Sequence, residues 1–129
     1  MSRILIVDDE PMIAELLVDW LGELGHEPLG PSRNTTSALA LIEATPPDAA
    51  IIDLSLGAES GYPVAESLAK SKIPFIFATG YGDGGVIPRF AGTRVLVKPF
   101  DFAALDAAVG EMINGCSPGP AISSMRRSG

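Results

Sequence analysis

Short apolar runs alternate with segments of helical periodicity along most of this chain. Four runs are continuous enough for strands buried on both faces of a sheet, and a fifth, EPLG at 27–30, is typical of a short strand. The four continuous runs are RILIV (3–7), AAIID (49–53), PFIFAT (74–79) and RVLVK (94–98). Strands that alternate with helices predict an α/β fold with one parallel sheet, right-handed crossovers and helices on both faces.

Four segments between and after these runs carry signals of helix starts and stops. Pro11 suits the first turn of the first helix, and Ser32 is predicted to cap the second. The prolines at 46–47 end that second helix. The predicted helices cover about 11–25, 32–44, 61–71 and 101–113.

Two further segments are poor in helical signal. Residues 80–93 contain five glycines and Pro88, so any helix there is predicted to be short. Residues 115–129 are rich in Gly, Pro and Ser and are predicted to form a disordered tail. The ordered domain is therefore expected to cover residues 1–114.

Composition and charge narrow the class of protein. A chain of 129 residues, 47% of them hydrophobic, is long enough for one domain with its own core. With 16 Asp and Glu against 9 Lys and Arg, the net charge is -7, which argues against a nucleic-acid partner. No apolar stretch can span a bilayer, the first strand leaves no room for a signal peptide, and the single cysteine fits a reducing compartment. We therefore expect a cytoplasmic protein without a membrane partner.

Polar residues with complementary chemistry stand at the ends of the predicted strands. Asp8 and Asp9 follow the first strand, and the others are Asp53, Thr79 and Lys98. Ligands of doubly wound sheets bind at the carboxyl ends of the strands, which lie about 4.8 Å apart. Crowded carboxylates must share protons or a cation, and oxygen ligands alone suit Mg²⁺. A carboxylate, Mg²⁺, an ammonium and a hydroxyl at one point predict a phosphoryl-transfer site with Asp53 as the nucleophile.

The motifs ILIVDDEP, AIIDLSL, FIFATG and VLVKPF, in this order and spacing, resemble the receiver domain of two-component response regulators. The resemblance covers roughly residues 3–114. It implies a flavodoxin-like, doubly wound sheet of five parallel strands in the order 2-1-3-4-5. It also implies that Asp53 is the phosphoacceptor and that Mg²⁺ is bound by Asp53 itself, by Asp9, by Asp8 through water and by the backbone carbonyl of Ser55.

Further roles are implied by the same resemblance. Thr79 and Lys98 would bind the phosphoryl group, and the Lys98–Pro99 peptide bond would be cis. Gly61 matches a glycine in the loop beyond the acceptor. The phosphoryl donor would be a phosphohistidine on a histidine kinase or a histidine phosphotransfer protein. Such a domain catalyses its own phosphorylation and dephosphorylation and is not expected to be a separate enzyme.

The chain also departs from the family pattern. Val95 stands where receivers commonly have a switch Tyr or Phe, and Gly57 stands where they commonly have Pro. PFIFATG is similar to a subgroup of stand-alone receivers with a Phe-Ala-Thr-Gly-x-Tyr motif, but Gly82 occupies the Tyr position. Tyr81, next to it, is a candidate replacement switch that would act with Thr79.

The 15 residues after Asn114 are too few for a DNA-binding or enzymatic domain. We therefore expect output by contact of the 80–114 face with a downstream protein, from a monomer or weak dimer. One alternative is a phosphoryl sink or phosphorelay intermediate without its own output. Another is an aspartyl-nucleophile phosphatase, although Ser55 stands where such enzymes need a second Asp. The G-x-G-x-x-G spacing within FATGYGDGG is a dinucleotide-binding fingerprint only after a first strand, and here it comes late in the chain.

Overall fold

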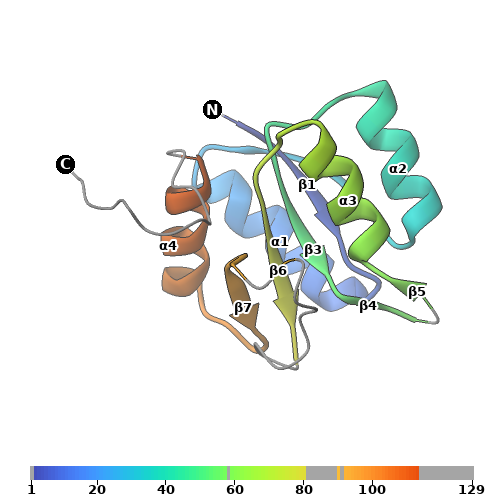
Figure 1. Ribbon diagram of the computed structural model, residues 1–129. Helices are drawn as coiled ribbons and strands as arrows, with labels where there is room; N and C mark the ends of the chain where they lie inside the picture. The colour runs from blue at the N-terminus through green and yellow to red at the C-terminus, as the bar shows by residue number, and fades with distance from the viewer. Residues whose placement is uncertain (1, 58, 81–89, 91, 114–129) are drawn as a thin grey trace.

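The structure is a computed structural model that describes residues 2–57, 59–80, 90 and 92–113. Figure 1 shows the order and arrangement of its elements. They are β1 (Arg3–Val7), α1 (Pro11–Glu23), β2 (Glu27–Ser32), α2 (Thr35–Ala44), β3 (Ala49–Asp53), β4 (Ser55–Leu56), β5 (Glu59–Ser60), α3 (Tyr62–Lys70), β6 (Phe75–Thr79), β7 (Val95–Val97) and α4 (Phe102–Ile113). The tail 115–129 and most of the segment 80–93 lie outside the described residues, so the disorder predicted for the tail and the short helix predicted at most for 80–93 stay predictions.

Five parallel strands form one sheet in the order β2-β1-β3-β6-β7. With the short strands β4 and β5 set aside, this is the predicted order 2-1-3-4-5, and the flavodoxin-like fold is confirmed. Val7 lies beside Ile52 on the neighbouring strand, and Asp53 lies beside Ala78 on the next. Because all five strands run the same way, their carboxyl ends meet along one edge of the sheet.

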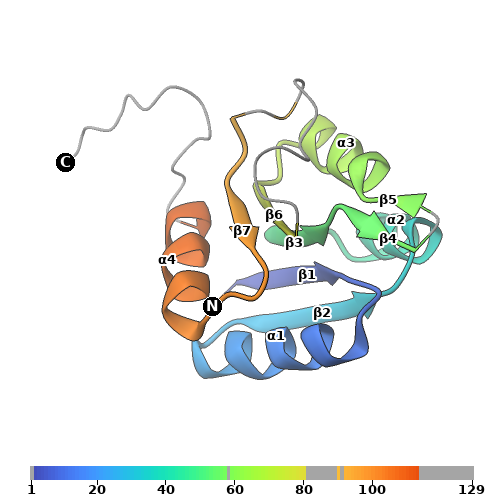
Figure 2. The same ribbon diagram turned by 90° about the horizontal axis from the view of Figure 1, so that it is seen from below.

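Alternate residues of each strand enter different halves of the core. In β1, Ile4 and Ile6 pack toward α1 and α4, whereas Leu5 and Val7 pack toward α2 and α3. Figure 2 shows these two pairs of helices on opposite faces of the sheet. Every residue of β3 is buried, as a strand with neighbours on both sides and helices on both faces should be. The sheet is therefore a rigid base for the residues at its carboxyl edge.

The second helix begins later than the sequence predicts. Ser32 does not cap it: Ser32 ends β2, where it pairs with Val7 and its carbonyl accepts the backbone N–H of Asp8 at 2.9 Å. Asn34 is the N-cap instead, and its side-chain oxygen accepts the N–H of Ser37 at 2.8 Å. Ser32 can pair in the sheet because β2 is an edge strand, and an edge strand tolerates the proline that precedes Ser32 at position 31.

A small hairpin that the sequence pattern does not predict follows β3. Strands β4 and β5 are antiparallel, with Ser55 opposite Ser60 and Leu56 opposite Glu59. Gly57, in the turn, has a φ of +66°, which glycine adopts freely and proline cannot, since its ring holds φ near −65°. The hairpin is tied to α2, because the N–H of Thr35 donates to the Glu59 carboxylate at 2.9 Å. This geometry accounts for Gly57 at a position where receivers commonly have Pro.

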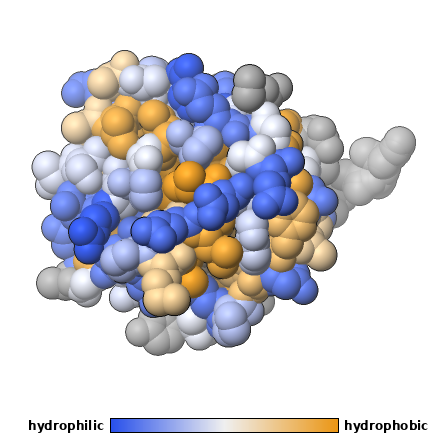
Figure 3. Space-filling model, turned by 180° about the vertical axis from the view of Figure 1, so that it is seen from behind, coloured by the Kyte–Doolittle hydropathy of each residue, from blue (hydrophilic) through white to orange (hydrophobic). Residues whose placement is uncertain are grey.

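The outer surface is mixed in character. Figure 3 shows the face on which α1 lies. Hydrophilic residues form a band across this face, with apolar residues on both sides of the band. Glu15, Asp19 and Glu23 of α1 are exposed there. Within the described residues, no helix is both long and apolar enough to cross a membrane.

Candidate functional site

The carboxyl edge of the sheet brings four of the predicted site residues to the ends of neighbouring strands. Asp8 follows β1, Asp53 ends β3, Thr79 ends β6 and Lys98 follows β7. Asp8, Asp53 and Thr79 are buried, with 1%, 4% and 1% of their surface exposed. The backbone N–H of Lys98 donates to the carbonyl of Thr79 at 2.8 Å, which continues the ladder between β6 and β7. The fold therefore assembles a polar site from residues up to 90 positions apart, since Asp8 and Lys98 differ by that number.

The ammonium group of Lys98 is the centre of this site. Its Nζ lies 3.0 Å from Asp8 Oδ2 and 3.0 Å from Asp53 Oδ2. It also lies 2.6 Å from Glu10 Oε1. The contacts to Glu10 and Asp53 are aligned as hydrogen bonds, whereas buried Asp8 Oδ2 receives none and is only ion-paired. The reach of Lys98 across two strands to Asp53, which the strand order predicts, is therefore present.

Both aspartates are oriented by the backbone two residues further on. The N–H of Glu10 donates to Asp8 Oδ1 at 2.9 Å, and the N–H of Ser55 donates to Asp53 Oδ1 at 3.0 Å. Asp commonly makes this turn, in which its side chain accepts from the main chain two residues later. In each case one carboxylate oxygen is fixed by the backbone, and the other faces Lys98.

Burial and charge act against each other at this site. Burial raises the pKa of Asp8 to about 6, with a smaller contribution from the charge of Asp53, although the Glu10 N–H and the Lys98 ammonium lower it. Burial by itself would lower the pKa of Lys98. Its contacts with the carboxylates of Glu10, Asp53 and Asp8 outweigh burial and raise that pKa above its usual value. Lys98 is therefore a cation at physiological pH, and the raised pKa of Asp8 lets it take up a proton at a higher pH than an ordinary aspartate.

The donor atoms at this site fit Mg²⁺. Asp8, Glu10 and Asp53 each offer a carboxylate oxygen, and these oxygens lie within 4.8 Å of one another. Oxygen ligands without His or Cys are the set that suits this hard ion. Asp8 Oδ2 in particular is buried and lacks a hydrogen bond, so it has unused capacity for a cation.

Two further groups predicted to bind Mg²⁺ are the Asp9 carboxylate and the Ser55 backbone carbonyl. Asp9 is half-buried and is not among the three clustered carboxylates of the described residues. Ser55 is the first residue of β4, two positions after Asp53, and its backbone N–H donates to the Asp53 carboxylate. The roles of Asp9 and of the Ser55 carbonyl as ligands stay predictions.

Glu10 is a member of the site that the sequence analysis missed. Its contact with Lys98 spans 88 positions of the chain. The one signal for it was its place directly after the aspartate pair in ILIVDDEP. A residue before a helical proline is usually assigned to the helix start, and only the tertiary structure shows that its side chain lies against Lys98.

The other predicted positions have a range of outcomes. The Lys98–Pro99 bond is cis, as the resemblance implied. A Cβ on Gly61 would lie 2.3 Å from the carbonyl oxygen of Asp53, so this glycine lets the chain pack against the acceptor backbone. Val95 lies in β7 beside Phe77, and with a half-buried side chain it packs against the core on the α2 and α3 side. Tyr81 lies outside the described residues, so its role as a switch stays a prediction.

Fold and site together define a doubly wound α/β protein with an acidic, lysine-containing site at the carboxyl edge of its sheet. The family model described as the response regulator receiver domain matches residues 4–110. The chain therefore belongs to the receiver domain family of two-component response regulators.

Several curated proteins and solved structures are similar to this chain. The transcriptional regulatory protein BaeR of Escherichia coli is 30% identical over 122 residues, which cover 90% of this chain and 50% of BaeR. The positive alginate biosynthesis regulatory protein of Pseudomonas aeruginosa is 37% identical over 103 residues, 75% of this chain and 41% of that protein. The chain thus spans about half the length of the curated relatives that it matches.

Among solved structures, SdrG from Sphingomonas melonis Fr1 has a TM-score of 0.79 and 43% identity, covering 88% of this chain and 97% of SdrG. TrrA from Thermotoga maritima, solved in complex with Mg²⁺ and BeF, has a TM-score of 0.76 and 34% identity, covering 87% of this chain and 99% of TrrA.

Proposed function

We propose that this chain is a single-domain response regulator that accepts a phosphoryl group on Asp53 with the help of Mg²⁺. The observation that carries the proposal is the Asp53 carboxylate, buried at the end of β3 with Lys98 at 3.0 Å and with Thr79 at the end of the adjacent strand. The complex of TrrA with Mg²⁺ and BeF, a mimic of a phosphoryl group, supports the same chemistry on a related sheet.

The chemistry is a transfer between two nucleophiles. A carboxylate oxygen of Asp53 attacks the phosphorus of a phosphohistidine on a histidine kinase or phosphotransfer protein, and the P–N electron pair returns to the imidazole. Lys98 binds the negative charge of the transferred group, and Thr79 donates a hydrogen bond to it. The Ser55 N–H holds the other Asp53 oxygen and so orients the nucleophile.

Mg²⁺ bound by the acidic residues would neutralise phosphoryl oxygens. Asp8 and Asp53 would hold it directly or through water, together with Asp9 and the Ser55 carbonyl.

The output in this proposal is contact with a downstream protein through the 80–114 face. Val97 in this face is a large hydrophobic side chain that is 50% exposed, directly before Lys98. A new phosphoryl group would attract Thr79 and Lys98. The movement of Lys98 would then be passed to this surface, because Val97 is joined to Lys98 by a peptide bond. SdrG, which is matched over 97% of its chain, has been solved in a BeF3-activated conformation, and this supports a stand-alone domain with an activated state.

An aspartyl phosphatase fits the site less well. The position that would carry its general acid is Ser55, whose backbone N–H is the donor to Asp53. We propose that the domain is not a separate enzyme and that turnover is limited to its own phosphorylation and dephosphorylation. A phosphoryl sink or relay intermediate remains the alternative output.

Incubation with acetyl phosphate and Mg²⁺, followed by intact-mass measurement, tests the acceptor. We expect the mass of one phosphoryl group to be added, and we expect hydroxylamine to remove it because an acyl phosphate is labile to that nucleophile. Asp53→Asn should not be labelled, whereas Asp19→Asn, an exposed carboxylate on α1, should be labelled like the wild type. Labelling of Asp53→Asn at the wild-type rate would overturn the assignment.

A further inference from the structure

Glu10 uses its side chain in an unusual way for a residue at the start of a helix. It is the N-cap of α1, and its side chain makes no capping hydrogen bond. The side chain instead reaches Lys98, where Oε1 lies 2.6 Å from Nζ. This is the shortest of the three carboxylate contacts that Lys98 makes.

The three carboxylates around Lys98 differ in how easily they can leave it. The Asp8 and Asp53 side chains are 1% and 5% exposed, and each has its other oxygen fixed by a backbone N–H. The Glu10 side chain is 58% exposed. Water can replace Lys98 as its partner, so separating Glu10 from the ammonium costs little, whereas separating a buried carboxylate costs much more.

A phosphoryl group on Asp53 needs the same ammonium. Lysine has three N–H donors, and three carboxylates already lie within 3.0 Å of Nζ. The phosphoryl group would be attached to the Asp53 oxygen that faces Lys98, because the Ser55 N–H holds the other one, so its anionic oxygens and the Glu10 carboxylate would compete for the same ammonium. Glu10 is the partner that yields most easily, and its charge also repels the anion while the two are close.

We propose that Glu10 is a positioning residue that occupies Lys98 in the unphosphorylated protein and is displaced by the phosphoryl group. Glu10 then sets how readily the site accepts that group, because every phosphorylation includes breaking the contact between Glu10 and Lys98. This inference rests on the proposed function of Asp53 as acceptor and gives Glu10 a role other than that of acceptor or metal ligand.

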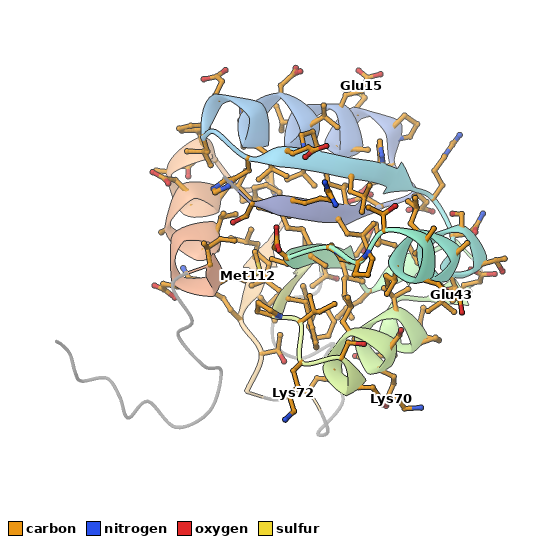
Figure 4. All side chains as sticks on the ribbon, turned by 90° about the horizontal axis from the view of Figure 1, so that it is seen from above. Glu15, Glu43, Lys70, Lys72 and Met112 are labelled. Atoms are coloured by element: carbon orange, nitrogen blue, oxygen red, sulfur yellow. The ribbon has the colours of Figure 1, made fainter. Side chains whose placement is uncertain are left out.

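Three substitutions separate this role from two competing ones. Glu10→Gln removes the charge and weakens the contact. Glu10→Asp keeps the charge, but its shorter side chain cannot make the contact to Lys98 and suits the N-cap of α1. Glu15→Gln removes the same charge from the outer side of α1, where Figure 4 shows Glu15 pointing away from the sheet.

The probe is beryllofluoride, which stands for the phosphoryl group on a carboxylate, titrated in the presence of Mg²⁺ and followed by the ¹⁹F NMR signal of the bound species. We expect Glu10→Gln and Glu10→Asp both to bind it about two- to fivefold more tightly than the wild type. Glu15→Gln should bind like the wild type. Fluorescence of Trp20 provides a second signal, because Trp20 packs against Phe100 and Phe102, shortly after Lys98.

Each contrary outcome has a distinct meaning. If Glu10→Asp binds like the wild type while Glu10→Gln binds more tightly, charge alone matters and the displacement role is wrong. If Glu10→Gln weakens binding of Mg²⁺ alone by tenfold or more, Glu10 is a metal ligand and the inference is also wrong. If both variants bind like the wild type, Glu10 has no such role, although the proposed function stands. If the wild type does not bind beryllofluoride, the proposed function itself fails.

Discussion

Lys98 is fixed to Thr79 by a backbone hydrogen bond of 2.8 Å, and its ammonium reaches Asp53 at 3.0 Å. The two residues predicted to bind a phosphoryl group are therefore held together by the sheet itself, and only the side chain of Lys98 has to move.

Lys98→Met should leave three crowded carboxylates without their common cation. Removing one partner of a largely buried ion-pair group leaves uncompensated charge, so we expect the free energy of unfolding in EDTA at pH 7 to fall by about 2 kcal/mol or more. Millimolar Mg²⁺ should restore more stability to this variant than to the wild type, because the ion replaces the lost charge. Urea denaturation with and without Mg²⁺ measures both effects. Lys70→Met, at the exposed end of α3, is the control and should change neither.

The stability of the metal-free protein should depend on pH through Asp8. Burial raises the pKa of Asp8 from 3.8 to about 6, so between about pH 4 and pH 6 the folded state binds more protons at this group than the unfolded state. Stability from this group is present below pH 4 and is lost as pH rises through 6, by about 3 kcal/mol. Asp8→Asn has no such group, and its advantage over the wild type in EDTA should grow across that window. A constant difference between the two proteins from pH 4 to pH 7 would contradict this prediction.

Gly61→Ala should disturb the acceptor directly. The added Cβ would lie 2.3 Å from the Asp53 carbonyl oxygen and 2.6 Å from Ile52 Cγ2, and backbone cannot move aside cheaply. We expect a loss of about 1–3 kcal/mol of stability, as in other overpacked sites, and slower labelling by acetyl phosphate. Gly110→Ala is the matched control, because no atom lies within 4 Å of its added Cβ in α4. That variant should be stabilised by about 0.5–1 kcal/mol through its better helix propensity.

Gly57→Pro, although it restores the residue that receivers commonly have here, should break the β4–β5 hairpin. Proline cannot adopt the φ of +66° found at this turn. The Glu59 carboxylate would then no longer be held against the N–H of Thr35, with which it pairs at 2.9 Å. Amide hydrogen exchange measures this contact, and we expect the Thr35 amide to lose protection while the amides of β1 keep theirs. Unchanged protection of Thr35 would show that the hairpin does not depend on the glycine.

The five sheet strands and the residues at their ends were predictable from the chain alone. Four of the five strands are short apolar runs, and a run of that length between helical segments has few alternatives in a small α/β domain. The position of Asp53, Thr79 and Lys98 directly after or at the end of such runs then places them on one edge, because parallel strands end together. Burial of Asp53 and Thr79 follows from the same placement.

The cap of the second helix shows the limit of local signals. Ser32 and Asn34 are both good capping residues, and the sequence alone does not rank them. The hydrogen bond from the N–H of Asp8 to the Ser32 carbonyl decides the matter, since it keeps Ser32 in the sheet. The two-residue strands of the hairpin have no periodicity at all and form through their contacts with each other and with α2.

The sequence by itself determined the class of fold, the five strands of the sheet and the set of polar residues at its carboxyl edge, because these depend on hydrophobic periodicity and on the chemistry of single residues. Only the tertiary structure decided which carboxylates share Lys98. Glu10 joined Asp8 and Asp53 around the ammonium, whereas Asp9 did not. The reason is that such contacts depend on side-chain direction and on ångström-scale distances between segments nearly 90 residues apart, neither of which leaves a pattern along the chain.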